Sequence, residues 1–389
     1  MILKGKPLRL YKYEVPEIRI NKHFLDINRP RLEYMYLPQS MTTFTNLRPT
    51  ESEEFIEDDN RGAVCQNHYV EIDGTRFYLS VKGIGSTTQP FSRDSFHPEE
   101  IYSLAGLRDN EIGNGQLSST SPRFITGELW LRGSPYGGQG LFHASISLSA
   151  SEMADVTSIG GFRIAPVVGI IQLPTELEGT IKKVFWYRRF GGRIVQEVRL
   201  VPSNVRIFFH SGSTLGSNIA SIFDQFKLDK EERVYRFLTN FVRSGIAYLT
   251  LFTRSMKSNE DGTLSGYDFY DVWLDKDAVL APDGTIYFVD LEGLDWVTID
   301  RSKVAEKIDD QIYRSLYEFM FAYEQIERER VRRFGNSTDR KIQFEHLLRE
   351  ALKDDEVVAI ERTGETLFLA VGNVLGEQSL IKKFPILDR

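Results

Sequence analysis

The stretch that most constrains this chain is residues 266–292, which read GYDFYDVWLDKDAVLAPDGTIYFVDLE. Two short apolar runs, residues 278–280 and 285–289, flank the turn signal Ala-Pro-Asp-Gly, and this pattern predicts a β-hairpin. Asp277 precedes the first run and Asp290 follows the second, so the hairpin brings two carboxylates to one end. Oxygen ligands from separate elements can hold a divalent cation. A surface turn with solvated acids is the alternative, although the apolar run before Asp290 favours a buried strand.

Composition excludes several broad classes of protein. At 389 residues with 41% hydrophobic content, the chain is long enough for a large core and for two subdomains or lobes. The net charge of -7 argues against a general nucleic-acid or membrane-surface binder, because such proteins need a basic face. Cys65 is the only cysteine, which excludes a disulfide framework and a thiolate zinc site.

The sequence also predicts where the protein resides. The N-terminus, MILKGKPLRLYKYEVPEIRI, lacks the apolar core of a secretory signal, and Glu14 and Glu17 are atypical of an organelle presequence. No stretch approaches the roughly 20 apolar residues needed to span a bilayer. We therefore expect a cytoplasmic protein with neither a membrane partner nor a nucleic-acid partner.

A first candidate phosphate contact follows a predicted hairpin. VEIDGTRFYLSVKGIGS alternates on both sides of Asp-Gly, which predicts two strands joined by a type I′ turn. The second strand ends on Lys82, and Gly83 and Gly85 follow it. A lysine beside glycines suits a phosphate contact, because glycine lets the backbone approach a ligand. A surface lysine before a turn is the alternative.

A second glycine-rich turn precedes a predicted helix. Gly137, Gly138 and Gly140 lie just ahead of a candidate helix at about residues 142–156, which carries Glu152. Backbone N–H groups at the start of a helix favour an anion, so this pattern favours a second phosphate contact. A glycine-rich turn without a ligand is the alternative.

The middle of the chain predicts strands and a pair of arginines. FRIAPVVGIIQLP, residues 162–174, is typical of a buried strand near a hinge, and two further strands are expected around Gly191 and Gly192. Arg199 and Arg206 flank a Pro-Ser turn. Two guanidinium groups beside a turn can converge on one phosphate. Surface arginines in ion pairs are the alternative.

From Asp229 onward, the apolar residues recur at helical spacing, which predicts a helix. Asp229 and Glu232 form a predicted capping box at its start. A second amphipathic helix is expected over residues 301–334, stopped by Gly-Asn, then a helix at about 339–353 and a hairpin around 363–364. The expected core positions of the first helix are Val234, Phe237, Leu238, Phe241, Val242 and Leu249.

Taken in order, these motifs resemble those of the selenoprotein O family, whose members have a protein-kinase-like fold and transfer AMP from ATP to hydroxyl side chains of other proteins. LSVKGIGSTT is similar to the family's Leu-Lys-Gly-x-Gly-x-Thr strand end, and YGGQG to its Gly-Gly-x-Gly turn. VRLVPSNVRIF resembles its Arg-x6-Arg segment, YDVWLDKDAV its catalytic loop, and VDLEG its Asp-Tyr-Gly. The resemblance covers about residues 70–296.

The resemblance implies ATP and Mg²⁺ or Mn²⁺ as cofactors. Asp277 and Asp290 are the implied metal ligands, with Asp277 in place of a family Asn that also binds through oxygen. In the family, the two arginines hold an ATP turned end for end relative to kinases, so that the α-phosphate faces the acceptor. The implied nucleotide-binding residues are Lys82, Gly83, Gly85, Gly137, Gly138, Gly140, Arg199 and Arg206.

Two departures from the family pattern concern catalysis. The proposed base of the family corresponds to Lys276, so Asp275 or Asp271 would have to act as the base. The family glutamate that pairs with the lysine corresponds to Ser147 in simple register, which leaves Glu152 as the candidate lysine partner.

The predicted fold is α+β: a protein-kinase-like, two-lobed fold with a β-rich N-terminal lobe and a mostly helical C-terminal lobe. Residues 1–60 are expected to form an extension that packs on the first lobe. Residues 61–174 form the N-terminal lobe, with an insertion at about 89–122. Residues 175–389 supply the remainder of the nucleotide site and the helical lobe, including the hairpin at 266–292.

The predicted function is a metal-assisted, ATP-dependent protein adenylyltransferase that acts on serine, threonine or tyrosine hydroxyls of a protein substrate. Two alternatives stay open. One is a kinase-like phosphotransferase, against which the paired arginines argue. The other is a catalytically inactive nucleotide-binding scaffold, which Lys276 at the base position favours.

Overall fold

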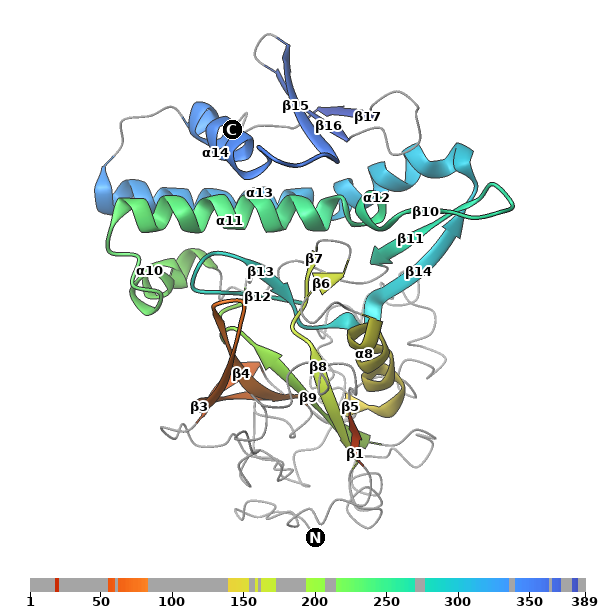
Figure 1. Cartoon of the computed structure of the whole chain (residues 1–389). Helices are drawn as coiled ribbons and strands as arrows, with labels where there is room; N and C mark the ends of the chain where they lie inside the picture. The colour runs from red at the N-terminus through yellow and green to blue at the C-terminus, as the bar shows by residue number, and fades with distance from the viewer. Residues whose placement is uncertain are drawn as a thin grey trace, which may run out of the picture. The chain divides into compact units, whose positions relative to one another are not determined.

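A computed structural model describes residues 18–20, 55–59, 62–82, 139–153, 158–159, 162–172, 194–206, 215–269, 277–335, 340–363, 366–371 and 380–383. These residues form a mixed α+β protein of sheets and helices (Figure 1). By their contacts they divide into two units. Unit 1 comprises Met1–Val156 and Ala165–Asn204, and unit 2 comprises Thr157–Ile164 and Val205–Arg389.

Unit 1 contains one antiparallel sheet, in which the strands follow the order β1-β8-β9-β4-β3-β2 and β5 pairs with β9. The β3–β4 hairpin turns at Asp73 and Gly74, whose φ values of 50° and 77° confirm the type I′ turn. The strands are β1 (Ile18–Ile20), β2 (Phe55–Asp59), β3 (Gly62–Ile72), β4 (Thr75–Lys82), β5 (Gln139–Gly140), β8 (Val167–Gln172) and β9 (Ile194–Val201).

One helix, α8 (Leu141–Met153), packs on this sheet. Its buried Ala144 and Leu148 form a core cluster with residues of β8 and β9, namely Val167, Ile170 and Val195. The helix predicted at residues 142–156 is therefore present, and its last expected residues lie outside the described part of the chain.

The apolar run at residues 162–174 does not form the single strand expected from its composition. It is divided into β7 (Phe162–Arg163), which pairs with β6 (Ser158–Ile159) in unit 2, and β8 in unit 1. The break coincides with Pro166, which has no N–H to donate to a ladder. The boundary between the two units falls beside this break.

Unit 2 is built on α11, which contacts α13, α14 and the strand β13. Figure 1 shows α11 and α13 running alongside each other. All six expected core positions of α11, from Val234 to Leu249, are buried, which confirms the helical pattern. The helices are α10 (Leu215–Gln225), α11 (Glu231–Leu249), α12 (Leu251–Ser255), α13 (Val304–Phe334) and α14 (Arg340–Ala351).

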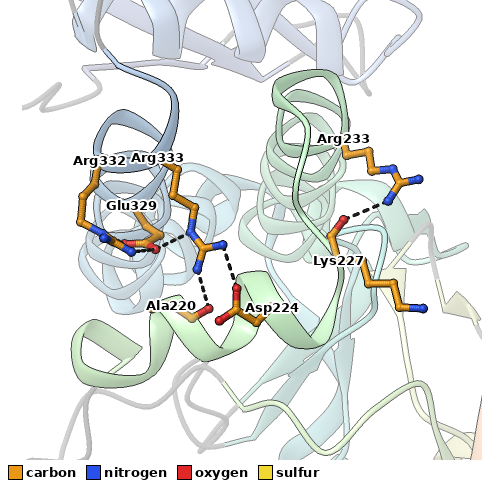
Figure 2. A network of polar contacts seen from close by, with 7 residues as sticks. All are labelled: Ala220, Asp224, Lys227, Arg233, Glu329, Arg332 and Arg333. Carbon is orange, nitrogen blue, oxygen red and sulfur yellow. Dashed lines mark hydrogen bonds and ion pairs between the residues drawn. The ribbon is translucent and has the colours of Figure 1, made fainter.

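The capping box predicted at the start of α11 is wrong. The residue before the first helical turn is Lys230, which makes no side-chain cap. Asp229 instead accepts a hydrogen bond from Arg233 Nη1 at 3.0 Å. Arg233 also donates to the carbonyl of Lys227 (Figure 2). The Asp229 side chain therefore binds Arg233 and makes no cap on the backbone.

The helix expected over residues 301–334 is α13, which ends where Gly335 adopts a φ of 84° and donates its N–H to the carbonyl of Val331. Its last turns bind α10. Arg333 donates to the carbonyl of Ala220 at 2.9 Å and to Asp224 at 2.8 Å, and Glu329 accepts hydrogen bonds from Arg332 and Arg333 (Figure 2).

Small sheets complete unit 2. The hairpin expected around residues 363–364 is present, with Thr363 opposite Thr366. The strands are β10 (Lys257–Ser258), β11 (Leu264–Phe269) and β14 (Leu294–Ile299) in one sheet, β12 (Ala278–Leu280) and β13 (Ile286–Phe288) in a second, and β15 (Val358–Thr363), β16 (Thr366–Val371) and β17 (Leu380–Lys383) in a third.

Aromatic side chains join these elements into one core. Phe162 of β7 lies 4.5 Å from Phe288 of β13 and 5.0 Å from Phe269 of β11, measured between ring centroids. Tyr248 of α11 stacks on Phe288, also at 4.5 Å. The three strands and the helix are therefore held at fixed positions by buried rings.

Candidate functional site

The hairpin predicted to carry two carboxylates is present in unit 2. Ala278 pairs with Phe288 and Leu280 with Ile286. The ladder extends one residue further, because the N–H of Val289 donates to the carbonyl of Asp277 at 2.9 Å. Asp277 and Asp290 therefore lie at the same end of the hairpin. Asp277 is 5% exposed and Asp290 is half-buried.

The opposite end of the hairpin is fixed by α11. Gly284 has a φ of 93°, and a Cβ atom added there would lie 2.0 Å from the carbonyl oxygen of Phe237. Asn240 donates to the carbonyl of Asp283 at 3.0 Å, and Ser244 Oγ accepts the N–H of Ile286 at 3.0 Å. Three successive turns of α11 thus bind the hairpin turn, so the backbone that carries the two acids has a defined position.

Arg206 lies beside this hairpin. It forms an antiparallel bridge with Val279, and the N–H of Leu280 donates to the carbonyl of Val205 at 2.8 Å. The Arg206 side chain is 8% exposed. Because residues two apart on a strand share a face, Val279 and Asp277 lie on the same face, and Arg206 is directly opposite Val279. Unit 2 therefore places this arginine next to the strand that follows Asp277.

The convergence of Arg199 and Arg206 on one phosphate, expected from the sequence, is not tested by the structure. Arg199 belongs to β9 of unit 1, and Arg206 belongs to unit 2. Arg199 is fully buried, so a surface arginine, the alternative for this position, is wrong.

Unit 1 brings Lys82 and Arg199 together on adjacent strands. In the β4–β9 register, Lys82 lies opposite Glu197 and Ser80 lies opposite Arg199. All four side chains are at most 2% exposed. Arg199 Nη1 lies 3.8 Å from Glu197 Oε1. The alternative of a surface lysine at position 82 is therefore wrong, and the structure adds a carboxylate that sequence reasoning missed.

The helix α8 contains Glu152, the predicted partner of Lys82. Among the side chains of α8 that the structure describes, the buried polar ones are Ser147 and Ser151, and Ser151 Oγ donates to the carbonyl of Ser147 while accepting the N–H of Val167. These serines occupy the face that packs on the sheet. Glu152 lies in α8, and its side chain is outside the described part of the structure, so the predicted contact with Lys82 is untested.

Several predicted site residues lie outside the described residues. This holds for both candidate bases and for four of the glycines. Gly140 is described: it is buried and pairs with Ile194 of β9. The residues that lie outside are Asp271, Asp275, Gly83, Gly85, Gly137 and Gly138.

A further polar cluster, missed by sequence reasoning, lies on the strand before the candidate catalytic loop. Asp268 of β11 is 4% exposed and accepts hydrogen bonds from Lys307 and, at 3.2 Å, from Gln311 Nε2. Gln311 Oε1 accepts the N–H of Phe252 at 2.8 Å. No periodic signal identifies this cluster, because its members come from β11, α12 and α13.

The donor set at the hairpin suits a hard divalent cation. Mg²⁺ is commonly bound by one or two carboxylates, with substrate phosphates and water as the remaining ligands. Asp277 and Asp290 supply two carboxylates. Within the described ranges, no group of three or more histidine, cysteine, aspartate or glutamate side chains is placed to hold a metal ion.

Comparisons with known proteins add no relative: no protein-family model, curated protein or solved structure matches this chain. In the part of the chain that the structure describes, no helix has the length and apolar character needed to span a membrane.

Proposed function

We propose that this chain is an ATP-dependent protein adenylyltransferase with a protein-kinase-like fold, which transfers AMP to a serine, threonine or tyrosine hydroxyl of a protein substrate. The observation that carries the proposal is the hairpin of unit 2, which holds Asp277 and Asp290 at one end while α11 binds the other. The order of elements around it also supports the proposal: helix α11, strand β11, the segment with Asp271 and Asp275, the hairpin, and then β14 and α13.

In this proposal, Asp277 and Asp290 hold Mg²⁺ or Mn²⁺. The metal ion, when bound, neutralises negative charge on the phosphates of ATP. Lys82, Arg199 and Arg206 bind phosphate oxygens and stabilise the charge that develops during transfer. The buried positions of Lys82 and Arg199 support this role, because electrostatic interactions are stronger away from water.

The proposed transfer follows an in-line displacement. The acceptor hydroxyl oxygen forms a bond to the α-phosphorus of ATP, and the bond from that phosphorus to the bridging oxygen of the β-phosphate breaks. Pyrophosphate leaves with the electron pair. Asp275 or Asp271 takes the hydroxyl proton, since Lys276 occupies the usual base position.

Labelled ATP tests the proposal directly. The purified chain is incubated with Mg²⁺ or Mn²⁺ and ATP labelled on either the α- or the γ-phosphate, and label is measured on the protein itself and on a generic protein acceptor. Label from the α position alone supports AMP transfer. Label from the γ position alone contradicts it and makes the chain a phosphotransferase, and no label with ATP still stabilising the fold makes it a scaffold.

Matched variants show whether the label depends on the hairpin. Asp290→Ala and Asp277→Ala should abolish transfer. Asp283→Asn is the control, because Asp283 is exposed at the opposite end of the same hairpin and is expected to leave transfer unchanged.

A further inference from the structure

The C-terminal end of β11 is bound on one side by two helices of unit 2. Asp268 is 4% exposed, and its two carboxylate oxygens accept hydrogen bonds from Lys307 and, at 3.2 Å, from Gln311, both on α13. Gln311 Oε1 accepts the N–H of Phe252 at 2.8 Å. Phe252 lies in the first turn of α12, where backbone N–H groups have no acceptor within the helix. One carboxylate thus joins β11 to both helices.

Two further contacts hold the preceding residues of β11 against α12. Ser255 Oγ accepts the N–H of Tyr267 at 2.8 Å. A Cβ atom added to Gly266 would lie 3.0 Å from the carbonyl oxygen of Phe252, so the strand and the helix are in close contact there. Three consecutive residues of β11, from Gly266 to Asp268, therefore contact α12 or α13.

The next residue of β11 contacts the hairpin that carries the two candidate metal ligands. Because side chains alternate along a strand, Phe269 points to the opposite face from Asp268. Its ring stacks on Phe288 of β13, with the centroids 5.3 Å apart and an interplanar angle of 24°. Phe288 pairs with Ala278, the residue after Asp277. The end of β11 therefore lies between the helices on one face and the hairpin on the other.

A carboxylate is a costly side chain at a buried strand position. Its charge is stable there because Lys307 supplies the opposite charge and both oxygens of Asp268 accept hydrogen bonds. Replacing a buried ion pair by apolar side chains often leaves stability unchanged or higher, so packing alone does not require an acid at this position. Hydrogen bonds to a charged group add direction, which fixes the strand end relative to α13.

We infer that Asp268 is a positioning residue for the metal site of the proposed function. Anchored on α13, it fixes the end of β11, and β11 in turn fixes the hairpin that places Asp277 and Asp290. The inference rests on the proposed function, because that function supplies the divalent cation. Binding of the metal ion alone tests the positioning role separately from AMP transfer.

Binding of Mn²⁺ to the full chain without nucleotide measures how well the two acids are placed. The electron paramagnetic resonance signal of free Mn²⁺ gives the dissociation constant. Asp268→Asn should weaken Mn²⁺ binding about tenfold, because ligands that lose their supporting contacts no longer hold one geometry. Asp268→Ala also removes the acceptor for Gln311 and should weaken binding further.

Lys307→Met separates positioning from simple electrostatics. The substitution removes a positive charge, so Coulomb forces alone would strengthen the binding of a cation. Positioning predicts the opposite result, a loss of about tenfold, because Asp268 loses its ionic partner. Stronger Mn²⁺ binding by Lys307→Met, or unchanged binding by Asp268→Ala, would overturn the inference.

Glu327→Gln controls for a general loss of stability. Glu327 is 2% exposed, binds Arg330, and lies on α13 about 24 Å beyond Gln311, at a rise of 1.5 Å per residue. This variant should lose stability in urea and keep wild-type Mn²⁺ binding. A loss of Mn²⁺ binding as large as that of Asp268→Asn would show that the effect is not specific to β11.

Two of the variants keep the contact with Gln311 in case Asp268→Ala does not fold. Asp268→Asn retains an acceptor oxygen, and Lys307→Met leaves the carboxylate in place, so either one carries the test. Failure of all three variants to fold would mean that Asp268 supports the fold as a whole and has no separate positioning role.

AMP transfer distinguishes this inference from the proposed function. Asp268→Asn should raise the Mn²⁺ concentration needed for half-maximal transfer about tenfold. Mn²⁺ binding that depends on Asp268, with no transfer by wild type, would contradict the proposed function and support the positioning role. Absence of Mn²⁺ binding by wild type would contradict both.

Discussion

The two units place their candidate functional groups in different ways. In unit 1, Lys82, Glu197 and Arg199 lie within or at the end of paired strands, and α8 covers the face that carries Glu197 and Arg199. In unit 2, Asp277 and Asp290 lie just outside the paired strands, at the open end of a hairpin. The first arrangement depends on the register between two strands, and the second depends on the position of the hairpin backbone. Changes of side chain and changes of backbone should therefore affect the two units differently.

The largest expected effect concerns catalysis by unit 2. Asp290→Ala should reduce AMP transfer by about 10³-fold or more, because the removed carboxylate stabilises charge in the transition state. Its thermal unfolding should stay close to that of wild type, since Asp290 is half-buried at a strand end. Transfer rates and Tm of the variant check both parts. A retained rate would remove Asp290 from the site.

The next largest effect tests whether the backbone of the hairpin matters. Gly284→Ala should destabilise the protein by about 3 kcal/mol or more, because the new Cβ atom would meet the Phe237 carbonyl oxygen at 2.0 Å and φ is 93°. Gly262→Ala is the matched control, with a φ of 85° and no atom within 4 Å of the added Cβ. Its cost should be about 1 kcal/mol, from strain alone. Urea unfolding measures both variants, and an equal loss in the free energy of unfolding for Gly284→Ala and Gly262→Ala would show that α11 does not constrain the hairpin turn.

A smaller effect is expected at the polar cluster around Asp268. Gln311→Leu should destabilise the protein by about 1–3 kcal/mol, because the buried N–H of Phe252 loses its acceptor and Asp268 loses a donor. Urea unfolding measures the cost. An unchanged free energy of unfolding would mean that the Phe252 N–H and Asp268 find other partners in the variant. Buried polar groups would then constrain unit 2 less than its buried charges suggest.

The smallest effect concerns the charged network at the C-terminal end of α13. Hydrogen bonds from Arg332, the largest cause, and from Arg333 hold the pKa of Glu329 below its usual value, against partial burial of the carboxylate, which raises it (Figure 2). A lowered pKa in the folded protein means that this stabilisation is present above the unfolded pKa, about 4.3, and is lost as pH falls through the folded value.

Glu329→Gln should therefore lower Tm slightly at neutral pH and flatten the loss of Tm on acidification. ATP binding should not change, because Glu329 contacts neither candidate set. If the Tm of the Glu329→Gln variant falls on acidification as steeply as the Tm of wild type, Glu329 is not responsible for the pH dependence of stability.

Much of the local structure could be predicted from the sequence. The β3–β4 hairpin, the hairpin that carries Asp277 and Asp290, and the buried face of α11 all follow from short-range patterns. The capping box at Asp229 could not be predicted reliably, because the Asp229 side chain has a competing partner in Arg233. The run at residues 162–174 was predicted as one strand because most of its residues are apolar, but it divides at Pro166 into β7 and β8.

The candidate site was predictable only in part. Asp277 and Asp290 were found because turn chemistry brings them together within a few residues of chain. Glu197 was missed because its relation to Lys82 arises from the register between β4 and β9, two strands far apart in sequence. Nothing in the residues around Glu197 distinguishes it from a solvated glutamate.

By itself, the sequence determined the β3–β4 hairpin, the hairpin that carries the two acids, and the helices α8, α11, α13 and α14, because alternation, turn residues and helical periodicity act over a few residues. The tertiary structure alone decided which carboxylate lies opposite Lys82 in the sheet and how Asp268, Lys307 and Gln311 meet. These contacts join elements that are distant along the chain. Their partners are selected by packing and by the need to pair buried charges, and local patterns carry no record of that selection.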